Sequence, residues 1–241
     1  MIVSCAGFSC VTINDCMTTP ILTLASNSPR RRELLALTGW TFDVRPAAID
    51  ETPHSAEAPD VYVSRLARSK GAATAGLLPA GRLVLAADTI VADGPELMGK
   101  PEGPEQAASM LRQLRGRTHQ VYTAIAVIET GLGNAPRMAE DRCRSNVPMR
   151  AYSDAEIDAY VATGDPLDKA GAYAIQHAGF HPVEQFSGCF ASVMGLPLCH
   201  LVRTLRKLGI TPPVDGSAAC QASLEYDCPV TTGILRGEDL G

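Results

Sequence analysis

The stretch RLVLAADTIVAD, residues 82–93, decides the fold class that we predict for this chain. It is almost continuously apolar, which is typical of a central strand buried on both faces of a sheet. The run THQVYTAIAVIET at 118–130 is rich in β-branched residues and predicts a second long strand. Between them, residues 104–114 place their apolar side chains on one side, as an amphipathic helix does. This alternation predicts an α/β protein with a mixed sheet.

Further strands and helices are predicted on both sides of this centre. The run ILTLA at 21–25 predicts a short buried strand that leads into a helix beginning at Pro29 and ending near Gly39. Ser153 and Glu156 have the spacing of a capping box, which predicts the start of another helix. The other expected elements are strands within 40–53, 144–151, 170–176 and 181–186 and helices at 60–77 and 198–208.

The two ends of the chain differ from its middle. The first residues lack the basic region of a signal peptide and include Asp15, and Met17 begins a natural-looking start. We therefore interpret 1–16 as a misassigned start or a disordered leader. Residues 212–241 carry Pro, Gly, Asp and Glu without periodicity and are predicted to be a loosely ordered, flexible tail. A single domain at 17–211 remains.

The composition argues against several functional classes. The net charge of −5 disfavours a general nucleic-acid surface, so any anion site must be a local concentration of Lys and Arg. No apolar run reaches 18 residues, so no membrane span is expected. None of the eight cysteines forms a C-x-x-C pair, and disulfide frameworks usually belong to smaller secreted chains. We expect reduced thiols and a cytoplasmic protein.

The stretch SNSPRRRELL at 26–35 concentrates positive charge at a helix start. Ser28 is the expected N-cap and Pro29 the first helical residue. Three arginines follow, although the helix dipole disfavours each cation there by about 0.3–1 kcal/mol. A multiply charged anion would reverse that penalty through charge-assisted hydrogen bonds and free backbone N–H groups. The alternative is a solvated basic turn in which Arg32 pairs with a local acid, and this stretch leaves both open.

Other candidate residues are scattered along the chain. Asp88 and Thr89 lie inside an apolar strand, where a carboxylate is costly unless it binds a metal, activates water or caps the strand end. Gln176 could recognise a nucleobase edge, or it could satisfy a buried backbone group. The adjacent acids Asp50 and Glu51 could equally belong to a polar loop. Lys100, Asp168 and Lys169 lie in predicted turns.

No standard nucleotide or zinc motif accompanies these residues. The chain has neither G-x-x-x-x-G-K-[ST] nor G-x-G-x-x-G, and its five histidines have no ligand spacing. What remains is a dispersed set of arginines, lysines, acids and an amide. Such a set suits a nucleoside triphosphate together with a hard divalent cation.

Seven short motifs occur in the order found in the Maf family of nucleoside triphosphate pyrophosphatases, which the chain resembles from about Leu22 to Leu208. They are LASNSPRRRELL, IDE, AADTIV, GKP, GRTHQVYTAIAV, PLDKAGAYAIQ and GLPL. The resemblance implies an α/β fold with an elongated, bent mixed β-sheet, flanking helices and a cleft between two lobes, similar to inosine triphosphatases. It also implies hydrolysis of nucleoside triphosphates, often non-standard ones, to a monophosphate and pyrophosphate.

The resemblance implies roles for the charged residues. Ser26, Arg30 and Arg31 would hold the triphosphate. Lys70 and Lys100 would add positive charge as catalytic groups. Glu51 and Asp88 would hold a divalent cation, Mg²⁺ or Mn²⁺, and Asp88 would accept the proton of the attacking water. Asp168 and Lys169 complete the expected substrate-binding set.

The resemblance also implies a base preference. Arg30, Thr89 and Gln176 match the specificity markers of the branch that prefers dTTP and UTP. His177 stands where the family usually has Gly, and Cys189-Phe190 where Ser-Tyr is common. These departures lie at the expected edge of the base pocket, so they bear on the predicted base preference.

Two other functions stay open on the sequence alone. One is a non-enzymatic nucleotide sensor that regulates a partner, for instance in cell division. The other is a nucleic-acid-binding module, which the acidic net charge disfavours. We expect the nucleoside triphosphate to be the partner, with no nucleic acid or membrane, and the sequence leaves a homodimer open.

Overall fold

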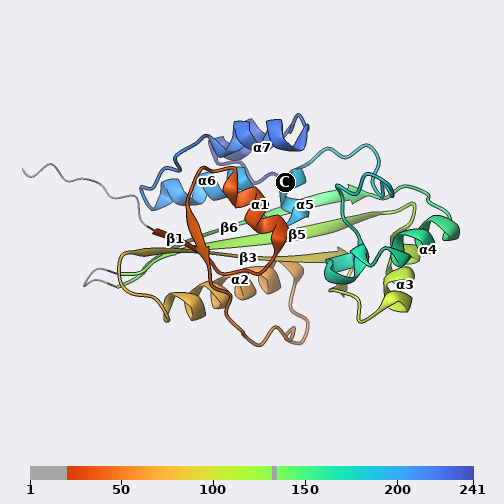
Figure 1. Cartoon of the computed structure of the whole chain (residues 1–241), viewed down its shortest axis with the longest axis horizontal. Coiled ribbons are helices and arrows are strands. Elements are labelled where there is room, and N and C mark those ends of the chain that lie inside the picture. The colour runs from red at the N-terminus through yellow and green to blue at the C-terminus, as the bar shows by residue number, and fades with distance from the viewer. Residues whose placement is uncertain (1–20, 132–134) are drawn as a thin grey trace, which may run out of the picture.

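The computed structural model describes residues 21–131 and 135–241, and one long mixed sheet runs through it (Figure 1). The expected leader at 1–16 lies outside these residues. The strand order is β2-β1-β3-β5-β6, and β4 pairs with β3. β1 is parallel to β2 and β3, whereas β4, β5 and β6 pair antiparallel with their neighbours. The strands are β1 Ile21–Leu24, β2 Phe42–Val44, β3 Arg82–Asp93, β4 Glu96–Met98, β5 Thr118–Glu129 and β6 Arg137–Pro148.

The two central strands β3 and β5 confirm the expectation from the apolar runs. β3 coincides with the predicted strand at 82–93, and β5 ends one residue before the predicted strand at 118–130. Most side chains of β3 are buried, as expected for a strand covered on both faces. The antiparallel register places Thr89 of β3 directly opposite Thr123 of β5.

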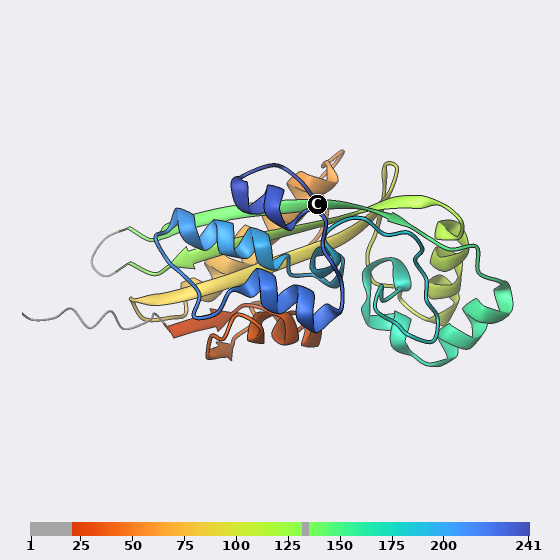
Figure 2. The ribbon, with the colours of Figure 1, turned by 90° about the horizontal axis from the view of Figure 1, so that it is seen from above.

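Helices cover both faces of the sheet (Figures 1 and 2). On one face, Val63 and Leu66 of α2 pack against Ile90 of β3. On the other face, α1, α5 and α6 lie over the larger core cluster, with Leu35 and Leu201 fully or almost fully buried. The helices are α1 Pro29–Ala36, α2 Pro59–Ala75, α3 Pro104–Leu114, α4 Asp154–Ala162, α5 Phe190–Met194 and α6 Leu198–Lys207.

A second lobe lies at the far end of the long strands. It contains α3, α4 and two 3-10 turns, η1 (Asp165–Asp168) and η2 (Ala170–Ala172). The capping box of α4 is confirmed: Ser153 Oγ accepts from the Glu156 N–H at 3.3 Å, and Glu156 Oε2 accepts from the Ser153 N–H at 2.7 Å. The elongated, bent mixed sheet and the two lobes are those that the resemblance implies.

Residues 212–241 differ from the loosely ordered tail that we predicted. Two short helices form there, α7 (Gly216–Leu224) and α8 (Thr231–Arg236). Asp215 caps α7 through the N–H groups of the two residues after Gly216, and Ile234 is fully buried. Both helices pack against α6. Elements this short carry too little periodicity to be recognised, and their order comes from tertiary burial.

Four predicted strands differ from the structure in extent or in kind. The strand predicted at 144–151 is longer at its start and ends earlier, because β6 runs Arg137–Pro148. The segment 40–53 is a strand only at β2, because its partner β1 has four residues. The segment 170–176 instead turns at Gly171, where φ is +69° and a Cβ would lie 2.9 Å from Val91. The segment 181–186 pairs only through Val183, bridged to Met149, next to a proline without an N–H.

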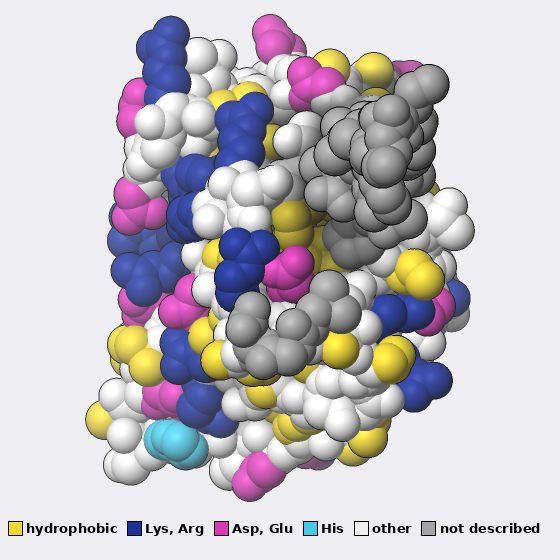
Figure 3. All heavy atoms as spheres, turned by 90° about the vertical axis from the view of Figure 1, so that its left-hand side faces the viewer, with side chains coloured by type: hydrophobic (Ala, Val, Ile, Leu, Met, Phe, Trp, Pro, Cys, Tyr) yellow, Lys and Arg dark blue, Asp and Glu magenta, His cyan; other side chains and the backbone are white. Residues whose placement is uncertain are grey.

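Charge of both signs is distributed over the surface. In the view onto the end of the molecule opposite α3 and α4, basic and acidic side chains are interspersed (Figure 3). Some of the charged side chains of the described residues form ion pairs, for example Arg82 with Asp43 and Arg137 with Glu129. Within the described residues, no helix combines the length and apolarity needed to cross a bilayer.

Candidate active site

A cavity of about 590 Å³ lies between the two lobes. Its walls come from the turn between β1 and α1, the middle of β3, the segment after η1 and the end of α5. The tertiary structure brings all of the predicted site residues to this one cavity: Ser26, Arg30, Arg31, Glu51, Lys70, Asp88, Thr89, Lys100, Asp168, Lys169 and Gln176. Five of these side chains are Lys or Arg and three are carboxylates, so the lining is set up for an anion.

The arginines at the start of α1 point in different directions. Ser28 is the N-cap, and its side chain accepts from the Arg31 N–H. Arg31 turns inward and donates from Nε to the Gly195 carbonyl at 2.9 Å and from its two terminal nitrogens to Ser26 Oγ and Thr89 Oγ1, both at 3.2 Å. The side chain of Arg31 is therefore fixed at three points, which accounts for a half-buried cation at a helix start.

The other two arginines have different environments. Arg30 reaches across the cavity, with 3.5 Å between its guanidinium and Asp168. Arg32 is exposed. The alternative of a basic turn exposed to solvent therefore holds only for Arg32, whereas Arg30 and Arg31 line the cavity.

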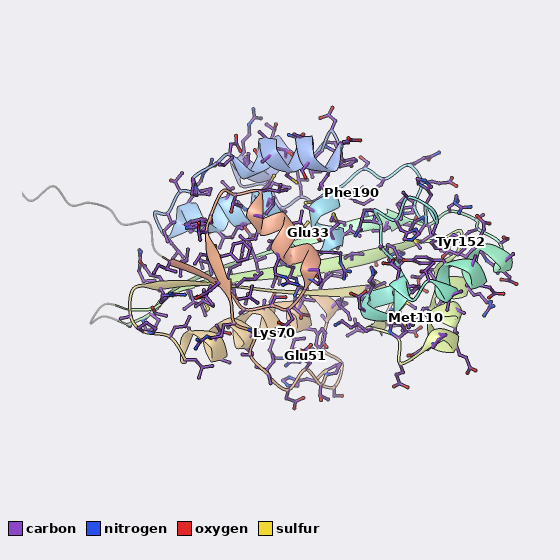
Figure 4. All side chains as sticks on the ribbon, viewed as in Figure 1. Glu33, Glu51, Lys70, Met110, Tyr152 and Phe190 are labelled. Carbon is purple, nitrogen blue, oxygen red and sulfur yellow. The ribbon has the colours of Figure 1, made fainter. Side chains whose placement is uncertain are left out.

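Asp88 is a buried carboxylate next to two cations. Lys70 Nζ lies 2.5 Å from Asp88 Oδ1 and 3.0 Å from Glu51 Oε1, so this ammonium bridges the two carboxylates. Figure 4 shows Lys70 on α2 and Glu51 on the loop beside it. Burial raises the pKa of Asp88, while Lys70 and Arg31 oppose that shift. Asp88 is thus a more basic carboxylate than an exposed aspartate.

Lys169 forms the opposite wall and is enclosed by acids. Its Nζ lies 2.8 Å from Asp165 Oδ1 and 2.7 Å from Asp168 Oδ1. Burial opposes the ionisation of Asp168, but Lys169 and Arg30 outweigh this effect and lower its pKa. Asp168 therefore stays ionised and connects the two walls of the cavity through Arg30.

Lys100 and Gln176 lie at the rim of the cavity with exposed side chains. The alternative for Gln176, an amide that satisfies a buried backbone group, does not fit this exposure. His177, Cys189 and Phe190 are absent from the described cavity lining, so the departures from the family pattern do not alter its walls directly.

The sequence comparison identifies the family of the chain. A profile described as Maf-like protein matches residues 21–208, which is more than half of the chain. The chain belongs to the Maf family. The match ends before α7 and α8, so these two helices lie outside the Maf region. The limits of the domain at 17 and 211 stay a prediction.

Similar proteins are named dTTP/UTP pyrophosphatase. One from Myxococcus xanthus (strain DK1622) is 49% identical over 194 residues, covering 80% of this chain and 95% of that protein. One from Thermomicrobium roseum is 47% identical over 189 residues, covering 78% and 84%. Among solved structures, a HAM1 protein from Coxiella burnetii aligns with a TM-score of 0.39 and 17% identity, covering 64% of this chain and 86% of that one.

Sequence reasoning assigned no role to three residues around the Maf cavity. Thr123 Oγ1 lies 2.9 Å from Thr89 Oγ1 and donates to the Ser192 carbonyl at 2.8 Å. Gly195 has φ +113°, and a Cβ there would lie 3.4 Å from both Arg31 Nε and Thr89 Oγ1. Asp165 holds Lys169. The GLPL motif marked Gly195, but Thr123 could be found only from the register of β3 and β5.

Proposed function

We propose that this Maf protein hydrolyses nucleoside triphosphates, with dTTP and UTP preferred, to the monophosphate and pyrophosphate. The observation that carries the proposal is the buried Asp88, held between Lys70 and Arg31 in a cavity rich in cations. The names of the 40–49% identical relatives support the same activity and the same pair of substrates.

The start of α1 suits a polyphosphate. Free N–H groups at a helix N-terminus and the helix dipole both favour negative charge. The Ser26 hydroxyl and the guanidinium groups of Arg30 and Arg31 line the cavity at this point. Arg31 is already oriented by the groups that it contacts, so little side-chain entropy is lost when a phosphate binds.

Glu51 and Asp88 suit a divalent cation. Both are carboxylates, the hard oxygen ligands that Mg²⁺ and Mn²⁺ prefer. The Lys70 ammonium between them indicates that this position favours positive charge. A cation held by Glu51 and Asp88 would neutralise phosphate oxygens and make a bound water more acidic.

Asp88 would act as the proton acceptor. A water oxygen attacks the α phosphorus, its proton passes to an Asp88 carboxylate oxygen, and the bond to the bridging oxygen of the leaving pyrophosphate breaks. The raised pKa of Asp88 makes it a stronger base, while Lys70 keeps it ionised before the reaction. Positive charge from Arg30, Arg31 and Lys100 would stabilise the departing pyrophosphate.

Base preference would depend on the residues at the rim of the cavity. Gln176 has an exposed amide that offers both a donor and an acceptor. The Thr89 hydroxyl is occupied by Arg31 and Thr123, so Thr89 would act by holding Arg31 rather than by contacting the base. Asp168 and Lys169 would shape the opposite wall.

The test is a pyrophosphate-release assay over a panel of nucleoside triphosphates with Mg²⁺ and with Mn²⁺. We expect hydrolysis with dTTP and UTP ahead of the others. Asp88→Asn should lower kcat by several orders of magnitude with the fold retained. Asp93→Asn is a matched control on the same strand, since Asp93 pairs with Arg117 and does not line the described cavity. Nucleotide binding without hydrolysis by the wild type would instead identify a regulator.

A further inference from the structure

A second group of potential ligands lies in the core, outside the active-site cavity. Cys143 on β6, Cys189 just before α5 and His200 on α6 bring two sulfurs and an imidazole nitrogen within 4.8 Å of one another. All three are buried, with exposed fractions of 2%, 3% and 0%. They come from separate parts of the chain, and the proposed hydrolysis uses none of them.

The main-chain carbonyl of His200 accepts from Thr204 Oγ1 at 2.8 Å, but the ring of His200 is not used in the same way. Within the described residues, neither of its ring nitrogens has a hydrogen-bond partner. A neutral imidazole carries a lone pair that can bind a metal ion. Buried polar groups are almost always satisfied, so a wholly buried, unpartnered imidazole next to two thiols indicates a missing ligand.

The chemistry of the three side chains selects the kind of ligand. Thiolate and neutral imidazole are the ligands that Zn²⁺ takes in proteins, whereas Mg²⁺ prefers oxygen. Two thiolates and one neutral imidazole would leave a Zn²⁺ site with no net charge, which lowers the cost of burial. Each thiol releases its proton to solvent when the metal binds.

We propose that Cys143, Cys189 and His200 form a structural site for a thiophilic divalent metal ion, with Zn²⁺ the best fit. In a tetrahedral zinc site the ligand atoms are roughly 3.4–3.8 Å apart, so these ligand atoms would approach one another by at most about 1.4 Å. Gly241, which lies beyond the Maf region, packs against the site. A Cβ added to Gly241 would lie only 2.6 Å from Cys143 Sγ, so no space is left on that side. Water or a main-chain oxygen would supply the fourth ligand.

The position of the site connects it to Arg31. Cys189 is the N-cap of α5, and the Ser192 carbonyl in α5 accepts from Thr123. The residue after α5, Gly195, accepts from Arg31 Nε. A metal on Cys189 would hold the start of the short segment that orients Arg31.

A purely apolar cluster and a disulfide are the two alternatives to a bound metal. Buried cysteines often act as small apolar residues, but this role leaves the free nitrogens of His200 without a purpose. A disulfide between Cys143 and Cys189 would use both thiols and also leave His200 without a function. Only the metal site accounts for all three side chains.

The test uses the full chain, reduced and stripped of metal, titrated with Co²⁺ and then with Zn²⁺. We expect one tightly bound Co²⁺ with the absorption bands of tetrahedral thiolate ligation, lost on displacement by Zn²⁺. Cys143→Ser and Cys189→Ser should abolish these bands, and His200→Gln should weaken binding by at least about tenfold. Cys220→Ser is the matched control, a buried cysteine outside the cluster that should retain them.

Protection mapping keeps the test decisive if a variant fails to fold. With Zn²⁺ bound to the wild type, alkylation followed by peptide mass analysis should spare Cys143 and Cys189. Absence of thiolate–Co²⁺ bands in the wild type would overturn the proposal. Protection from alkylation confined to Cys5, Cys10 and Cys16 would also overturn it. So would a disulfide between Cys143 and Cys189 in place of bound metal. Loss of pyrophosphatase activity alone would test the proposed function and not this site.

Discussion

Replacing Thr123 with valine tests whether a buried threonine supports the side chain that faces the triphosphate. Thr123 is fully buried, and its hydroxyl contacts Thr89 Oγ1 at 2.9 Å and the Ser192 carbonyl at 2.8 Å. Valine has nearly the same shape but makes neither hydrogen bond. The Ser192 carbonyl still accepts from the Gly195 N–H, so it is not orphaned. The loss is therefore two hydrogen bonds at about 0.5–1.5 kcal/mol each, or about 1–3 kcal/mol.

This loss should appear in both stability and kinetics. For a chain of this size each kcal/mol corresponds to roughly 2–4 °C in Tm, so we expect a decrease of about 2–12 °C. Thr89 would lose its support and hold Arg31 less firmly, which should lower kcat/KM for dTTP by up to about tenfold, or 1.4 kcal/mol. Differential scanning calorimetry and steady-state pyrophosphate release measure the two effects. Thr118→Val, on the same strand but exposed, should change stability by less than about 0.5 kcal/mol.

A double-mutant cycle with Thr89→Val sharpens this test. Because the two hydroxyls contact each other, the combined variant should cost less stability than the two single variants added together. Strictly additive losses, or an unchanged Tm and kcat/KM in Thr123→Val, would refute the idea that the threonine pair supports Arg31.

Titratable and polar groups of the cavity and of the core lead to three more predictions. Lys70→Met removes the strongest interaction that lowers the pKa of Asp88. The pH at which kcat/KM falls on the acidic side of its profile should therefore increase. If that pH does not change, Asp88 is not the titrating base. In the metal-free chain, His119 and His200 are buried with pKa values of about 4, so the unfolded chain binds more protons and the folded state loses stability as pH falls from about 6.5 towards 4. Urea unfolding should give a loss of about 1.5 kcal/mol per histidine between about pH 6.5 and pH 5, and His119→Phe should flatten the profile; equal stability at both pH values would contradict the assignment. Gln176→Glu should change the ratio of rates for UTP, dTTP, CTP and GTP more than it changes the rate with the best substrate, and a constant ratio would remove Gln176 from base recognition.

Several elements of the fold followed from local patterns. The apolar run at 82–93 and the β-branched run at 118–130 predicted the two central strands, because burial on both faces requires that composition. Ser153 and Glu156 predicted the start of α4, because capping depends on neighbours three residues apart. The helices α7 and α8 were not predicted, since each is short and is ordered by tertiary packing against α6.

The ordered motifs of the sequence determined the family and a list of charged residues for the site, because both depend on residue type and order along the chain. Only the tertiary structure decided which charges meet. It turned Arg31 inward and left Arg32 in solvent, set Lys70 between Glu51 and Asp88, and paired Thr89 with Thr123 through the strand register. It also brought Cys143, Cys189 and His200 together from three elements. Contacts between distant residues depend on how strands pair and helices pack, and no local pattern contains that information.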